Sequence, residues 1–197
     1  MSIATNICLI YGSAREGRFC DTVAGWAHHE LDRRGDFRVS IVDPLDGRSS
    51  GERNATLAEA DAFIVVTPEY NHSFPAPLKT IIDGAKSEWE AKPVAFVSYG
   101  GISGGLRAVE QLRTVFAELH AVSVRDQVSI AFAGRAFDEA GRPRDAQGVG
   151  EAFAVMLDRL VWWSDALAQV RGCCRFVRAP RWSPQIVSGK ARVAGRG

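Results

Sequence analysis

Short apolar runs rich in β-branched residues alternate with longer segments of helical periodicity along most of this chain. In the longer segments, apolar residues recur with a period of about 3.6 residues, which is typical of amphipathic helices. Strands that alternate with helices favour a parallel sheet covered by helices on both faces. The predicted strands are residues 6–11, 38–42, 62–67, 93–99 and 122–130, and the predicted helices are residues 21–34, 54–60, 75–89, 105–119 and 150–170.

The number of predicted strands selects among the parallel architectures. Five strands favour the flavodoxin-like order 2-1-3-4-5 over the six-stranded order of dinucleotide-binding folds. We therefore expect an α/β three-layer sandwich around a five-stranded parallel sheet. In such sheets, ligands bind beyond the carboxyl ends of the strands, where the strand order reverses. The loops to examine follow strands one, three and four, and their sequences are GSAREGRF, PEYNHSFPAP and GGISGG.

Length, charge and cysteine usage narrow the class of protein. The 197 residues suit one domain, which we place at residues 1–172, followed by a basic extension at 173–197. A formal charge of +1 gives no reason to expect nucleic acid as a partner. We find neither a signal peptide nor an apolar run that could span a membrane. The cysteines at 8, 20, 173 and 174 form no CxxC pair, so we expect a reduced, cytoplasmic protein with Cys8 in its core.

The loop after the first strand predicts an anion site. It leads into a helix whose first N–H groups are free and carry partial positive charge. Ser13 adds a hydroxyl, and Arg15 and Arg18 add charge-assisted donors. Because the loop lacks both GxGxxG and the P-loop lysine, a terminal phosphate monoester is favoured over a pyrophosphate. A solvated loop with surface arginines is the alternative interpretation. We interpret Asp43, after the second strand, as a turn residue before Pro44 rather than a ribose ligand.

The loop after the third strand combines groups that suit a flat ligand with polar edges. Pro68 ends the strand because it lacks a ladder donor. Tyr70 offers a ring, Asn71 offers amide donors and an acceptor, and the backbone amides of residues 69–71 are expected to point toward the switch point. The loop can therefore hold the rim of a planar heteroaromatic. For Glu69 we favour a structural role, either as a cap or at a subunit interface.

The loop after the fourth strand, SYGGISGGLRA at 98–108, holds four glycines in six residues. Glycine allows positive φ and lets the backbone approach a ligand closely. A glycine-rich turn alone is weak evidence for a site. Three such loops, each after a parallel strand, together predict one ligand site at the switch point.

These motifs, GSAREGR, PEYNHSFPAPLKTIIDGAKSEW and SYGGISGGLRA, resemble the NADPH-dependent FMN reductase family of flavodoxin-like proteins. The resemblance covers residues 6–130 and keeps the order and spacing of all three motifs. It implies a non-covalently bound FMN, reduction by NADPH or NADH, a small-molecule electron acceptor, and a homodimer or dimer of dimers. Lys79 and Asp83 match a helix that family members use in dimer packing.

The resemblance also assigns site residues. It places Ser13, Arg15, Arg18, Phe19 and Cys20 around the FMN phosphate, Pro68, Glu69, Tyr70 and Asn71 along the flavin ring and ribityl chain, and Ser98, Tyr99, Gly100 and Gly101 at the pyrimidine end. The family frequently has serine at position 18 and asparagine at position 20. A thiol is a weak donor, and one hypothesis is that Cys20 is reactive because a helix N-terminus lowers its pKa. No side chain is assigned as a catalytic acid or base.

Two other classes of protein remain open from the sequence. An electron carrier or sensor would hold FMN without turnover, and a scaffold would have lost the flavin. A carrier of the flavodoxin type would suit an acidic surface, whereas this chain is near neutral. The sequence does not choose among quinones, azo compounds, free flavin, metal oxyanions and a biosynthetic intermediate as acceptor.

The last helix and the tail suggest an assembly. Trp162 and Trp163 are adjacent, and we expect Trp163 on the core-facing stripe and Trp162 to the side. The tail from Arg171 onward contains several arginines and no acidic residue. We expect it to pack across a homodimer boundary near the flavin site.

Overall fold

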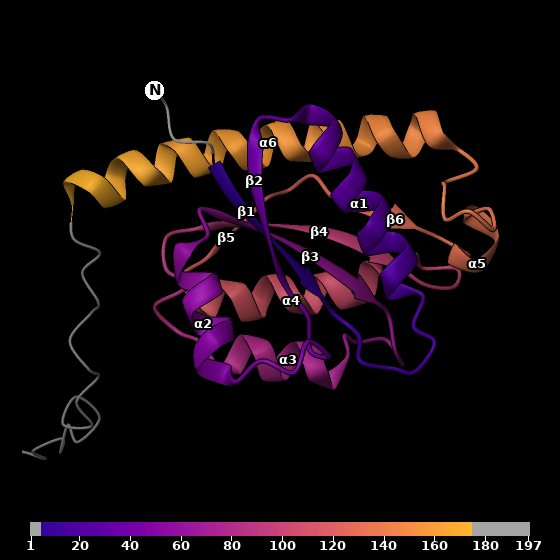
Figure 1. Ribbon diagram of the computed structural model, residues 1–197, viewed down its shortest axis with the longest axis horizontal. Helices are drawn as coiled ribbons and strands as arrows, with labels where there is room; N and C mark the ends of the chain where they lie inside the picture. Colours follow the sequence, from indigo (N-terminus) through magenta and orange to yellow (C-terminus); the bar gives the residue numbers. More distant parts are fainter. Residues whose placement is uncertain (1–4, 175–197) are drawn as a thin grey trace, which may run out of the picture.

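The computed structural model describes residues 5–174, which form a six-stranded parallel sheet between two layers of helices (Figure 1). The sheet order is β2-β1-β3-β4-β5, and β6 also pairs with β4. The predicted flavodoxin-like order is thus confirmed. The strands are β1 (Thr5–Tyr11), β2 (Phe37–Val42), β3 (Ala62–Pro68), β4 (Pro93–Tyr99), β5 (Val122–Ser123) and β6 (Val128–Ile130).

The fifth predicted strand, 122–130, is divided into β5 and β6. Arg113, on a neighbouring helix, explains the division. Its guanidinium donates to the carbonyls of Val124 and Arg125 and to the side chain of Gln127, at 2.7, 3.0 and 2.8 Å. These contacts draw the intervening residues away from the regular ladder at the edge of the sheet.

The helices follow the predicted segments with altered ends. They are α1 (Cys20–Arg34), α2 (Ser50–Glu59), α3 (Ala76–Asp83), α4 (Leu106–Glu118), α5 (Ala133–Ala136) and α6 (Ala146–Cys173). The helix α2 begins earlier than predicted because Ser49 and Glu52 form a capping box. The helix α3 ends at Asp83, and the buried Trp89 folds back to donate to the Ile82 carbonyl at 3.2 Å.

Each face of the sheet packs against its own set of helices (Figure 1). The helices α1 and α6 cover one face, where Trp26 and Phe153 meet edge to face at 5.3 Å. The helices α2, α3 and α4 cover the other, where Trp89 packs between Phe63 and Phe116. Both cores are apolar, and the predicted core position of Cys8 is confirmed, with no exposed surface.

The expected core position of Trp163 is wrong. The inward stripe of α6 passes through Leu160 to Ser164, four residues on, and Ser164 donates to the Asp61 carbonyl at 3.4 Å. Trp163 is 36% exposed and Trp162 is 60% exposed, and their rings contact each other edge to face. Both tryptophans therefore lie on the outer side of α6.

None of the helices within residues 5–174 is long and apolar enough to cross a membrane. The helix α6 ends one residue beyond the expected domain boundary. The predicted basic extension, and its packing across a subunit boundary, therefore lie almost wholly outside the described residues.

Candidate functional site

A crevice of about 670 Å³ opens at the carboxyl ends of β1 and β3, where the strand order reverses. A smaller hollow of about 340 Å³ continues from it toward Pro44 and Arg53. The two share Ala14, Ala76 and Pro77 in their walls. The crevice itself is lined by Ala14, Arg15, Glu69, Tyr70, Asn71, Pro75, Ala76 and Pro77. The first two predicted loops and the first turn of α3 therefore meet in one place.

The first loop begins at Gly12, directly after β1, where any side chain would force the neighbouring backbone to move. Gly12 donates its N–H to the Val66 carbonyl at 2.8 Å. A Cβ on Gly12 would lie 2.7 Å from that carbonyl oxygen, closer than real Cβ atoms approach backbone. This close approach holds the start of the loop against β3.

Ser13 joins the first loop to the second. Its hydroxyl lies 3.0 Å from the Tyr70 hydroxyl and accepts the Arg15 N–H at 3.3 Å. The Ser13 residue is fully buried. Its side chain therefore fixes the relative position of the two loops and is not open to the crevice.

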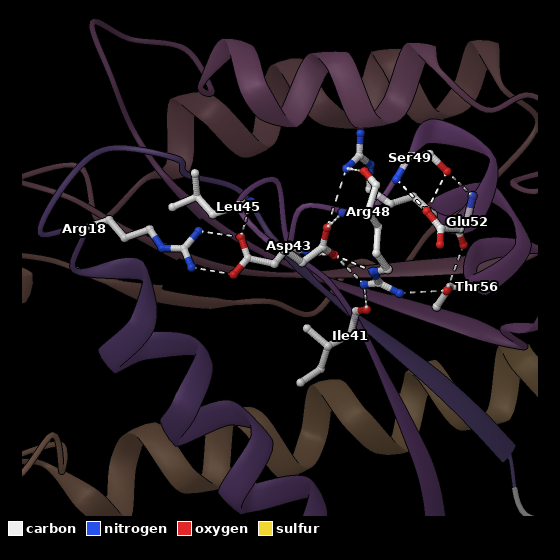
Figure 2. A network of polar contacts seen from close by, with 10 residues as sticks. Arg18, Ile41, Asp43, Leu45, Arg48, Ser49, Glu52 and Thr56 are labelled. Carbon is white, nitrogen blue, oxygen red and sulfur yellow. Dashed lines mark hydrogen bonds and ion pairs between the residues drawn. The ribbon is translucent and has the colours of Figure 1, made fainter.

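Arg18 does not face the crevice as a free cation. Its guanidinium forms a two-pronged ion pair with Asp43 at 2.7 and 2.5 Å (Figure 2). It also donates to Asp21 and to the Ser13 carbonyl. The hydrogen bonds that Arg18 donates to Asp43 raise the pKa of Arg18. Burial alone would raise the pKa of the Asp43 carboxyl, but the Arg18 hydrogen bonds outweigh it and lower that pKa. We expected Asp43 to be a turn residue. In the structure its carboxylate also anchors the loop after β1, through Arg18.

The same network continues from Asp43 into α2 (Figure 2). Asp46 accepts the Asp43 N–H at 3.3 Å and the Arg48 Nε–H at 2.7 Å. Arg48 also donates to Thr56 at 3.0 Å and to the Ile41 carbonyl. The end of β2 and the start of α2 are therefore tied to the first loop by charge-assisted hydrogen bonds.

Arg15 is the cation of the first loop that remains available. Its side chain is exposed at the crevice wall and forms no hydrogen bond or ion pair with residues 5–174. The nearby N-terminus of α1 has no side-chain cap. An uncapped helix start beside a free guanidinium is a suitable place for an anion.

Phe19 and Cys20 lie in the core behind the first loop. Phe19 packs against Tyr99 and Phe137 with ring centroids 6.0 and 5.6 Å apart. Cys20 is fully buried, and its thiol lies 3.7 Å from the Val66 carbonyl. Burial raises the pKa of the Cys20 thiol. The hypothesis of a reactive thiol with a lowered pKa is therefore wrong, because desolvation dominates over the helix terminus.

The second loop contains a tight turn at Tyr70 to Ser73. These two residues exchange backbone hydrogen bonds at 2.8 and 3.0 Å, and Asn71 and His72 both have positive φ, at 51° and 67°. Two such residues in succession define a type I′ turn. Gln111 on α4 supports it, accepting from the Ser73 hydroxyl and donating to the His72 carbonyl. The turn thereby places Asn71 at the crevice wall.

Glu69 bridges the second and third loops. It accepts the Arg107 N–H in the first turn of α4 at 3.1 Å and the Arg107 guanidinium at 2.8 Å. Burial alone would raise the pKa of the Glu69 carboxyl, but hydrogen bonds from Ser103 and Arg107 outweigh it and lower that pKa. The expected capping role is confirmed. The sequence analysis did not single out Arg107 or Gln111, because their partners lie 38 and 39 residues away.

The structure does not bring the predicted residues of the third loop into the wall of the crevice. Ser98 is fully buried and donates to the Gly104 carbonyl at 2.8 Å, and Tyr99 is 5% exposed. Gly104 and Gly105 have positive φ, and a Cβ on either would strike a neighbour. Gly100 and Gly101, by contrast, have no atom closer than 3.4 Å to a built Cβ. None of residues 98–101 lines the crevice of about 670 Å³.

A larger hollow of about 860 Å³ lies at the sheet edge beside β5 and β6. Its lining includes Arg113 and Gln127, which bond to each other. It lies away from the switch point and holds none of the predicted site residues. We therefore place the candidate site at the crevice between the first two loops.

The sequence profile described as NADPH-dependent FMN reductase matches residues 5–135 of this chain. An NAD(P)H-dependent FMN reductase of Schizosaccharomyces pombe is 34% identical over an alignment of 125 residues that covers 53% of this chain and 62% of the relative. A probable NADPH:quinone oxidoreductase of Oryza sativa is 40% identical over 97 residues, covering 46% of this chain and 49% of the relative. The matched part thus spans less than two thirds of these relatives' own length.

Solved structures show the same fold. FerB, a flavoenzyme NAD(P)H:(acceptor) oxidoreductase of Paracoccus denitrificans, superposes with a TM-score of 0.65 at 18% identity, over 82% of this chain and 98% of that one. A flavodoxin variant of Pseudomonas aeruginosa superposes with a TM-score of 0.51 at 19% identity, over 85% of this chain and all of that one (100%).

Proposed function

The chain belongs to the NADPH-dependent FMN reductase family, and from this premise we propose that it is an FMN-dependent NAD(P)H oxidoreductase. It would pass two electrons from NADPH or NADH to a small acceptor such as a quinone, an azo compound, a flavin or a biosynthetic intermediate. The observation that supports the cofactor site best is the free Arg15 guanidinium in the wall of the switch-point crevice, beside the uncapped start of α1.

The residues of the crevice fit FMN by their chemistry. Arg15 and the amides that lead into α1 would hold the terminal phosphate. Pro68 to Asn71 would border the ring and ribityl chain, and Ser98 to Gly101 would contribute through backbone, since the side chains of Ser98 and Tyr99 are buried. The other residues predicted at the phosphate would hold the first loop in position without touching the ligand. They are Ser13, Arg18, Phe19 and Cys20.

When bound, FMN supplies the two-electron chemistry between the nicotinamide donor and the acceptor. The chain's own contribution is position and electrostatics. The N–H group of Asn71 donates to no acceptor among residues 5–174, so it is available to a ligand in the crevice that gains negative charge. No side chain at the crevice is needed as an acid or base for hydride transfer, and we assign none.

We further propose a homodimer or dimer of dimers in the cytoplasm, with residues 1–172 as the FMN-binding domain and 173–197 as a basic extension. On α3, Lys79 and Asp83 pair at 2.6 Å with both side chains exposed, which suits a subunit boundary. All four cysteines are free, which is typical of a reducing compartment. Light scattering at micromolar concentration tests the assembly, and a monomer would contradict it.

Titration of the apoprotein tests the phosphate site. FMN should bind much more tightly than riboflavin, which lacks the phosphate, and more tightly than FAD or NADH. A hydrogen bond to a charged group contributes about 1.5–3 kcal/mol, so Arg15→Ala should weaken FMN binding about tenfold or more. Riboflavin binding should barely change in that variant.

The matched control is Arg125→Ala, which removes a 93% exposed arginine at the far sheet edge. It should bind FMN as the wild type does. Equal affinity for FMN and riboflavin, or an Arg15→Ala protein that holds FMN as tightly as the wild type, would contradict the assignment.

Turnover separates an enzyme from a carrier or a flavin-free scaffold. The holoprotein should oxidise NADPH or NADH steadily when a quinone is present. A flavin spectrum without turnover across a panel of acceptors would favour the carrier, and a protein that binds no flavin would favour the scaffold.

A further inference from the structure

The helix α6 ends in two adjacent cysteines that are both exposed. Their sulfur atoms, Cys173 Sγ and Cys174 Sγ, lie 3.5 Å apart. The other two cysteines, Cys8 and Cys20, are fully buried. The chain therefore carries one accessible pair of thiols, separate from the candidate flavin site.

The helix end brings the two sulfurs together. Consecutive side chains of a regular α-helix point about 100° apart and do not face each other. Cys174 has left the helix, with φ −129° and ψ 129°, while its N–H still donates to the Val170 carbonyl at 2.8 Å. The last turn is anchored by Arg171, which donates to the Ala91 carbonyl at 2.5 Å. The helix end that carries the pair is thus tied to the segment before β4.

The spacing favours a shared third atom over a disulfide. Neighbouring Cα atoms lie about 3.8 Å apart across a trans peptide, whereas disulfides usually need about 4.4–6.8 Å. Two sulfurs bound to one soft centre at about 2.3 Å each lie about 3.3–3.8 Å apart for bond angles between 90° and the tetrahedral value. The observed 3.5 Å falls within that interval.

The number of thiols available indicates which sulfur-binding atom the pair can hold. A metal ion bound by thiolates normally takes four ligands in a structural site. Residues 5–174 contain no cluster of three or more histidine, cysteine or acidic side chains that could hold a metal. A trivalent arsenical with one organic substituent needs two thiols, because its third bond is to carbon.

We propose that Cys173 and Cys174 form a dithiol site that binds a monosubstituted trivalent arsenical. With an arsine oxide, two S–H bonds and the arsenic–oxygen bond break, two arsenic–sulfur bonds form, and the oxygen leaves with both protons as water. Arsenic stays trivalent, so no oxidant or reductant is required. The site lies toward the amino ends of the strands, whereas the crevice lies at their carboxyl ends, because Arg171 contacts Ala91, just before the start of β4.

Phenylarsine oxide and the full-length protein test the proposal. A thiol reagent should titrate two cysteines in the native protein and none after one equivalent of phenylarsine oxide, and intact mass should show one adduct per chain. A large excess of glutathione should not remove the adduct, whereas a small dithiol should.

Cys173→Ser and Cys174→Ser serve as matched variants, since each leaves one exposed thiol. A second thiol held nearby acts at high effective concentration, so each variant should bind phenylarsine oxide about 100-fold or more weakly and lose it to glutathione. Circular dichroism and the unfolding midpoint check that the variants fold. Equal retention by wild type and variants, or a native protein without titratable thiols because the pair is oxidised, would overturn the proposal.

Discussion

The Arg18 guanidinium donates to both carboxylate oxygens of Asp43, at 2.7 and 2.5 Å, although the two residues lie 25 positions apart in the sequence. Arg18 is 7% exposed and Asp43 is 18% exposed at the side chain. This ion pair joins the loop after β1 to the end of β2. It explains why Arg15, and not Arg18, is the arginine that remains open to an anion.

Replacing Arg18 by lysine should destabilise the protein. Lysine keeps the charge but lacks the fork that satisfies two oxygens at once. We expect Arg18→Lys to lower the free energy of unfolding by about 1–3 kcal/mol, measured by urea denaturation. The control is Arg15→Lys, at an exposed position without a partner among residues 5–174, which should stay within about 0.5 kcal/mol of the wild type. Similar effects at the two positions would contradict the anchoring role.

The Asp43 contribution should disappear in acid. Its pKa in the folded protein is lowered, so its stabilising effect is complete above the unfolded value of about 3.9 and is lost as the pH falls through the folded value. The stability difference between wild type and Asp43→Asn should therefore be constant near neutral pH and shrink below about pH 4. Denaturation series at several pH values measure it. A difference that persists unchanged to pH 2 would argue against the charged pair.

Gly12 should not tolerate a methyl group. The added Cβ would lie 2.7 Å from the Val66 carbonyl oxygen, so β1 or β3 would have to move. We expect Gly12→Ala to lower the free energy of unfolding by about 1–3 kcal/mol. Gly25 is the matched control, because it lies inside α1 with open space around it. Gly25→Ala should stabilise the protein by about 0.5–1 kcal/mol, since alanine favours the helix.

Lys92 should make stability rise with pH in the alkaline range. It is 8% exposed, donates to the carbonyls of Leu57 and Ala58 at the end of α2, and burial lowers its pKa to about 8. Between about pH 8 and 10 the unfolded chain binds more protons than the folded one, so unfolding becomes harder. The wild type should gain up to about 3 kcal/mol relative to Lys92→Met over this range. If the difference in free energy of unfolding between the wild type and Lys92→Met does not change with pH, the pKa of Lys92 is not lowered in the folded protein.

The periodicities of the chain predict the fold and the position of the site. The alternation of apolar runs with helical stripes correctly predicts the strand order, and the switch point then selects the loop from Gly12 and the loop from Glu69 as neighbours. A structural role for Glu69, as a cap or at a subunit interface, is also predicted, although its partner Arg107 is not. These successes rest on patterns that are local in sequence, because the period of apolar residues sets which face of an element is buried.

Contacts between distant segments are decided only by the tertiary structure. Arg18 pairs with Asp43, and Cys20 is buried with a raised pKa, because β2 and β3 pass beside the first loop. Trp163 lies outside because Ser164, which bonds to Asp61 over 103 residues, takes the inward position. The sequence by itself determines which faces are apolar and where the chain turns. Which polar group meets which partner depends on the path of the whole chain, since burial and hydrogen bonding act through space and not along the sequence.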